Sequence, residues 1–133
     1  MINNKQLGNQ TEKMFLNYVK ENRGWACLIP SSLLGQPLDI VGIVHGIPIY
    51  VDIKHCSRDV FMFSDIQTNQ KLSMQKICEA FEDSYAYAKV GLMIYFEVIK
   101  DWRFYPYQAL ETDLAYKRKG VSVTDTRLER LDV

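Results

Sequence analysis

Apolar positions follow a helical period near the start of the chain. Over residues 7–20, the positions that a helix places on one face are mostly apolar, and they are Leu7, Thr11, Phe15, Tyr18 and Val19. A short polar run at residues 22–24 ends in glycine and predicts the end of this helix. The pattern therefore predicts an amphipathic helix with one side packed against a core.

The middle of the chain instead has the pattern of short strands separated by turns. Runs rich in Val, Ile and aromatic residues predict strands at residues 25–29, 38–44, 47–53, 60–63, 90–98 and 102–107. The dipeptide His45-Gly46 separates the second and third runs at hairpin distance. Pro48 favours an edge or bulged start for the third run, because proline lacks a backbone donor. Residues 30–37 contain two serines, one glycine and two prolines, and are predicted to be a loop.

Polar residues then mark a second helix and a mixed C-terminal segment. Ser64-Asp65-Ile66-Gln67 has the form of a capping box and predicts a helix that runs to about Asp83. The tail from Gln108 is expected to hold a short helix and a final strand. With no repeat or linker visible, the order of elements predicts an α/β fold with a central mixed sheet flanked by helices, in a single domain over residues 1–133.

Composition narrows the class of protein. The chain has 16 Lys and Arg against 16 Asp and Glu, so its formal net charge is zero and any interaction with nucleic acid must rest on local features. Cys27, Cys56 and Cys78 form no C-x-x-C pair, which argues against a disulfide framework or a structural zinc site. No run of residues is apolar enough for a signal peptide or a membrane span, and we expect a cytoplasmic protein.

Two acidic residues and a lysine stand out in the predicted hairpin. A turn centred between residues 45 and 46 places Asp39 directly opposite Asp52, and alternation along the strand places Lys54 on the same face as Asp52. Opposed like charges are destabilising unless a cation neutralises them. Hard oxygen ligands at this spacing suit Mg²⁺ or Mn²⁺. The alternative is that Asp39 caps the strand entry and Lys54 forms an exposed salt bridge with Asp52.

Two further polar residues interrupt apolar faces. Glu12 shares a helical face with Phe15 and Val19, and Gln70 lies between Ile66 and Met74 on the face of the second predicted helix. Each has an ordinary alternative, because Glu12 could be a solvated flank residue and Gln70 a buried amide bonded to backbone.

These residues resemble a known signature. Pro37-Leu38-Asp39 followed by Asp52-Ile53-Lys54 resembles the motif of the PD-(D/E)XK nuclease superfamily, and Gly8 with Glu12 is similar to its preceding helical acid. Other segments are similar, in order along almost the whole chain, to RecU-type Holliday-junction resolvases, and these are residues 63–74, 90–96, 105–110 and 119–123.

The resemblance implies a restriction-endonuclease-like fold, a homodimer, and Mg²⁺-dependent hydrolysis of branched DNA such as a four-way junction. It implies these site residues: Asp39, Asp52, Lys54, Glu12 and Gln70 as catalytic residues, with Asp39, Asp52, Glu12 and the carbonyl of Ile53 as metal ligands. Two departures stand beside it. Asp52 occupies a position where Glu is commoner, and residues 30–37 replace the long insertion that forms the RecU stalk.

Other functions stay open at this point. The chain could be a nuclease of the same superfamily that acts on non-junction DNA, or a non-catalytic module that binds DNA or protein. The run Lys117-Arg118-Lys119 is either a phosphate contact or a solvated basic tip. His45 and His55 do not suggest a zinc site, because one lies in the turn and the other has the opposite strand parity from Asp52.

Overall fold

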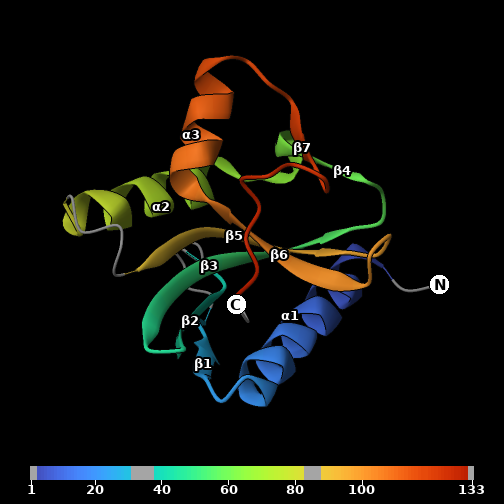
Figure 1. Ribbon diagram of the computed structural model, residues 1–133, viewed down its shortest axis with the longest axis vertical. Helices are drawn as coiled ribbons and strands as arrows, with labels where there is room; N and C mark the ends of the chain where they lie inside the picture. The colour runs from blue at the N-terminus through green and yellow to red at the C-terminus, as the bar shows by residue number, and fades with distance from the viewer. Residues whose placement is uncertain (1–2, 31–37, 83–87, 132–133) are drawn as a thin grey trace.

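The structure is a computed structural model that describes residues 3–30, 38–82 and 88–131. Its elements, in chain order, are α1 (Asn4–Glu21), β1 (Trp25–Leu28), β2 (Ile40–Val44), β3 (Ile47–Cys56), β4 (Val60–Met62), the 3-10 turn η1 (Phe63–Asp65), α2 (Thr68–Ala80), β5 (Lys89–Phe96), β6 (Asp101–Pro106), α3 (Tyr107–Ala115) and β7 (Gly120–Ser122) (Figure 1). Five strands form one sheet in the order β1-β2-β3-β5-β6, and β4 pairs with β7 in a small second sheet. The β3–β5 pair is parallel and the other pairs are antiparallel, so the predicted mixed sheet is confirmed.

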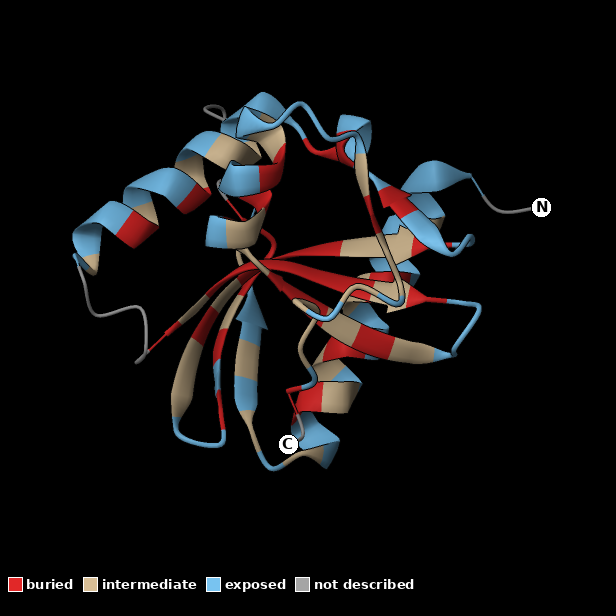
Figure 2. Cartoon of the chain, turned by 45° about the horizontal axis from the view of Figure 1, so that its top comes forward, coloured by how far each residue is buried: buried red, intermediate tan, exposed pale blue. Residues whose placement is uncertain are grey.

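Helices cover both faces of the large sheet, with α1 on one side and α2 and α3 on the other (Figure 1). On the α1 side, Phe15 and Val19 pack with Val51 of β3. On the other side, Met74 and Leu110 pack with Leu92 of β5. The central strands are accordingly buried along most of their length (Figure 2). Among the described residues, no helix combines the length and apolarity that a membrane crossing requires.

The turn between β2 and β3 sets their register. His45 and Gly46 both adopt positive φ angles, 52° and 78°, as a type I′ turn requires. This two-residue turn pairs Val44 with Ile47 and Ile43 with Pro48, without a bulge. Pairing of β3 with β5 begins only at Ile49, so the start of β3 is locally an edge and accommodates proline.

Several element boundaries differ from the sequence predictions. The first helix starts earlier, at Asn4, because Asn3 and Gln6 form a capping box. Phe63 belongs to η1 rather than to a strand, and Tyr107 opens α3. The predicted capping box at residues 64–67 is wrong, since the box that opens α2 consists of Gln67 and Gln70. The predicted loop at residues 30–37, apart from Pro30, and the predicted helix end at Asp83 lie outside the described residues.

Candidate active site

Two carboxylates face each other where β2 begins. The register pairs Ile40 with Val51, so Asp39, one residue before β2, lies opposite Asp52 in β3. Both side chains are buried, with exposed fractions of 8% for Asp39 and 0% for Asp52. The backbone N–H of Ile53 donates a 2.8 Å hydrogen bond to Asp39 Oδ2. The predicted opposition of the two aspartates is therefore confirmed.

The Asp52 carboxyl lies in an environment that disfavours its negative charge. Its Oδ1 accepts a 3.0 Å hydrogen bond from Gln70 Nε2, whereas the contact of Oδ2 within the described part of the chain is an ion pair with Lys54 Nζ at 3.1 Å. Burial raises the pKa of Asp52, and the Asp39 carboxyl beside it raises that pKa further. Lys54 lowers the pKa, but by too little to restore its ordinary value. The charged form of Asp52 would therefore be stabilised by a cation.

Lys54 supplies a fixed positive charge beside this pair. Its Nζ lies 3.1 Å from Asp52 Oδ2 in an ion pair. The same ammonium donates hydrogen bonds of 3.1 Å to the backbone carbonyl of Asp65 and 3.2 Å to Gln70 Oε1. The salt bridge with Asp52 that the alternative expects is therefore present, but the Lys54 side chain is only 16% exposed and does not lie at an exposed strand end.

Gln70 connects the site to the start of α2. Besides its bonds to Asp52 and Lys54, its Oε1 accepts a 3.0 Å hydrogen bond from the backbone N–H of Gln67. One amide therefore completes the helix cap and holds two charged groups of the site. The alternative of an amide bonded to backbone holds in part for Gln70, which has one such bond besides its bonds to two charged side chains. Gln67 and the carbonyl of Asp65 were missed in the sequence, although the spacing of Gln67 and Gln70 is a capping-box spacing.

Glu12 lies on the other side of the sheet from the Asp39–Asp52 pair. It lies on α1, which covers the opposite face of the sheet, one turn before Phe15. Burial raises the pKa of Glu12, and the negative charge of Asp39 raises it further, which places the two carboxylates within electrostatic reach. In the parts of the chain that the structure describes, no three His, Cys, Asp or Glu side chains come close enough to hold a metal ion. The structure thus brings together Asp39, Asp52, Lys54 and Gln70, and leaves Glu12 at the margin.

The donor set nevertheless fits a divalent cation. The opposed carboxylates of Asp39 and Asp52 are hard oxygen ligands, and the buried Asp52 Oδ2 already contacts a cation, the Lys54 ammonium, rather than a neutral donor among the described residues. Mg²⁺ keeps several waters and is commonly bound through one or two carboxylates, so two aspartates satisfy its usual protein ligand count. The two histidines are separate, since His45 lies in the turn and His55 pairs with Glu97 at 3.0 Å.

Comparisons with known proteins bear on the fold. No protein-family model matches the sequence, and no curated protein matches it. Among solved structures, the chain is similar to Hjc of Archaeoglobus fulgidus, a Holliday junction resolvase from an archaeal hyperthermophile. The TM-score is 0.58 at 15% sequence identity, over 76% of this chain and 78% of that chain. At this identity the similarity is one of fold, and the protein has the restriction-endonuclease-like fold, with a five-stranded mixed sheet between helices.

Proposed function

We propose that the protein is a metal-dependent endodeoxyribonuclease of the PD-(D/E)XK type that hydrolyses branched DNA as a compact, RecU-like Holliday-junction resolvase. The observation that carries this proposal is the buried Asp39–Asp52 pair with Lys54 on the same face of the sheet. A buried pair of acids is costly in a protein that has no cation to bind. The similarity in fold to a Holliday junction resolvase supports the same function.

Each residue has a distinct part in the proposed reaction. A bound Mg²⁺ or Mn²⁺ ion would polarise the scissile phosphodiester and make a water acidic enough to attack near neutral pH. Asp39 and Asp52 would hold this ion, with the carbonyl of Ile53 as a further ligand, whereas Glu12 is too far from the pair in the described structure to be assigned as one.

Lys54 and Gln70 act beside these ligands. The Lys54 ammonium is fixed by Asp52, Gln70 and the Asp65 carbonyl, so it needs little reorganisation to orient the attacking water and stabilise the developing charge. Gln70 fixes the relative positions of Asp52 and Lys54.

A junction cutter must act on two strands, and we propose that the protein works as a homodimer. Two identical sites related by a two-fold axis would cut a four-way junction at symmetric positions.

The test is cleavage by the purified full chain of a fluorescein-labelled four-way junction and of a linear duplex with the same arm sequence, with and without Mg²⁺. We expect paired, symmetric cuts in the junction that require the metal. Asp52→Ala and Lys54→Ala should each reduce the rate at least about 100-fold while thermal melting confirms that both variants fold.

The matched control is Lys20→Ala, because Lys20 is an exposed lysine in the last turn of α1. This variant should cleave at the wild-type rate. Cutting of duplex and junction at equal rates would favour a nuclease for non-junction DNA. Undiminished cutting by either active-site variant would refute the site, and absence of cutting with any DNA would favour a binding module.

A further inference from the structure

A second site-like feature lies beside the acidic centre, between η1, the first turns of α2 and the segment that joins α3 to β7. It is a groove with a volume of about 290 Å³, and we call it the basic groove. Three cationic residues, Lys71, Arg118 and Lys119, contribute to its lining together with Ser64, and most of the lining surface is apolar. Its described lining contains no carboxylate, so the groove favours an anionic ligand.

The positive charge of the groove is only partly neutralised. Arg118 donates a 2.7 Å charged hydrogen bond to Asp113. Neither Lys71 nor Lys119 forms an ion pair with any carboxylate of the described residues. Lys119 is exposed, and the Arg118 side chain is 54% exposed. Two lysines without an ion pair among the described residues and one half-exposed arginine therefore belong to the same groove.

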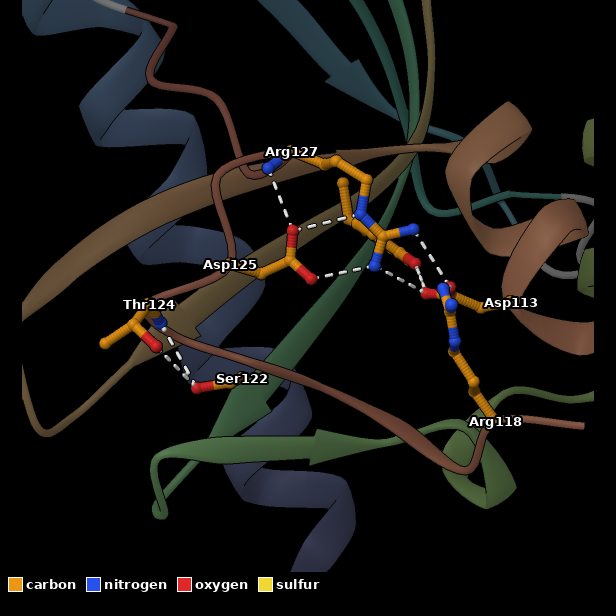
Figure 3. A network of polar contacts seen from close by, with 7 residues as sticks. Asp113, Arg118, Ser122, Thr124, Asp125 and Arg127 are labelled. Carbon is orange, nitrogen blue, oxygen red and sulfur yellow. Dashed lines mark hydrogen bonds and ion pairs between the residues drawn. The ribbon is translucent and has the colours of Figure 1, made fainter. Parts of the chain in front are cut away.

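The geometry of Arg118 is fixed by the end of α3. The N–H of Arg118 bonds the Asp113 carbonyl at 2.9 Å, and the N–H of Lys117 bonds the Leu114 carbonyl at 3.0 Å, which is the pattern of a Schellman motif. The Arg118 guanidinium then returns to the Asp113 carboxylate, which also receives Arg127 (Figure 3). Burial alone would raise the pKa of Asp113, but hydrogen bonds from Arg127, Tyr105 and Arg118 lower it to about 2. The anchor of Arg118 is thus ionised at neutral pH.

The backbone of Lys119 is fixed to η1, on the other side of the basic groove. Its backbone carbonyl accepts a 2.8 Å hydrogen bond from the N–H of Phe63, where η1 begins. The next residue, Gly120, approaches β4 so closely that a Cβ atom there would lie 2.6 Å from the carbonyl oxygen of Phe61. The close β4–β7 pairing therefore brings Lys119 to the same groove as Lys71, which is 48 positions earlier in the sequence.

The basic groove and the acidic centre use the same two elements, η1 and α2. The η1 turn carries Ser64 in the groove and, at the next residue, the Asp65 carbonyl that holds Lys54. In α2, Gln70 contacts Asp52 and the next residue, Lys71, lines the groove. The groove and the acidic centre are therefore built on neighbouring residues of η1 and of α2.

We propose that the basic groove binds a backbone phosphate of the DNA strand that flanks the scissile phosphate. This inference rests on the proposed nuclease function, and it adds a substrate-binding site outside the residues assigned to catalysis. Lysine binds phosphate as a point charge and arginine binds it through a planar fork, so the groove offers both kinds of donor.

The experiment measures DNA binding rather than cleavage. The double variant Lys71→Ala/Lys119→Ala and the wild type are titrated against a fluorescein-labelled duplex and a labelled four-way junction by fluorescence anisotropy, with Ca²⁺ in place of Mg²⁺. Loss of the contact to this one phosphate should weaken binding about tenfold at about 0.1 M salt and reduce the slope of log K against log salt by about 0.9. The variant Lys71→Arg/Lys119→Arg should restore both values, and Lys20→Ala should change neither.

The outcomes separate this inference from the proposed function. Wild-type protein that cuts DNA, together with a double alanine variant that keeps the wild-type affinity and salt slope, would overturn the groove and leave the nuclease standing. Failure of wild-type protein to bind either DNA would overturn both. Equal loss of affinity in Lys20→Ala would also refute the groove, because the effect would then be one of net charge.

Discussion

Replacing one carboxylate of the Asp39–Asp52 pair should make the metal-free protein more stable. In Asp39→Asn, the amide oxygen can still accept the Ile53 N–H bond, and the new NH₂ group can donate toward Asp52. Two unit charges about 5 Å apart repel by about 3 kcal/mol at an effective dielectric constant of about 20. Since a bound proton already relieves part of this repulsion, we expect a gain in the free energy of unfolding of about 1–3 kcal/mol near pH 8.

The gain should depend on pH with a definite sign. Burial and the neighbouring carboxyl raise the pKa of Asp52, so the wild type is penalised as pH rises from the unfolded-state value toward the raised value. The advantage of Asp39→Asn should therefore grow from about pH 5 to about pH 8 and nearly vanish below about pH 4. For a chain of 133 residues, it corresponds to a rise in Tm of about 3–12 °C at pH 8.

The assay is thermal unfolding at several pH values, with EDTA and then with Mg²⁺ or Mn²⁺. At about 10 mM metal and a dissociation constant of about 1 mM, the wild type should gain about 1.4 kcal/mol, and Asp39→Asn should gain little. Asp59→Asn serves as the matched control, because Asp59 is an exposed aspartate outside the site. Destabilisation by Asp39→Asn at pH 8, or equal stabilisation of both proteins by metal, would refute the reasoning.

Three further predictions concern charge and helix ends. If the carboxylate pair binds a divalent cation as proposed, Ca²⁺ should tighten DNA binding by adding two positive charges. Anisotropy titrations with Ca²⁺ and with EDTA would check this, and equal affinities would contradict it. Because the pKa of Asp113 is lowered to about 2, its ion pairs should contribute about 2 kcal/mol to the free energy of unfolding, fully above about pH 4 and progressively less toward pH 2. The free energies of urea unfolding of the wild type and of Asp113→Asn should therefore converge as pH falls, and a constant difference would contradict this. Lys117 adopts a φ of 59° where helix ends favour glycine, so Lys117→Gly should stabilise the fold by about 0.5–1 kcal/mol in urea unfolding, and a loss of stability would count against the Schellman assignment.

The hairpin shows how far sequence alone reaches. A two-residue turn fixes register, and register with strand alternation fixes which side chains share a face. Asp39, Asp52 and Lys54 are therefore predictable as one patch from local spacing, and the fold has them there. The face of α1 that buries Thr11, Phe15 and Val19 is predictable for the same reason, because helical periodicity is a local property.

The helix that follows is less predictable. Both Ser64 and Gln67 have plausible capping side chains, and local sequence does not choose between them. The choice depends on β4, which pairs with β7 and draws Phe63 into η1, so that the helix begins later than the Ser64 box would place it. Gln70 can contact Asp52 because α2 begins at Thr68, after the Gln67 cap.

Sequence by itself determined the α/β class, the hairpin and the charged patch on one sheet face, since these follow from periods and turns within a few residues. Tertiary structure decided which distant groups join that patch. It brought Gln70 into contact with Lys54 and left Glu12 at the margin of the acidic centre, on α1 at the other face of the sheet. Through the β4–β7 pairing, it also placed Lys71 and Lys119 in the lining of one groove. These long-range contacts depend on how whole helices and strands pack against one another. The free energy that selects this packing is distributed over the buried core and does not come mainly from the residues in contact.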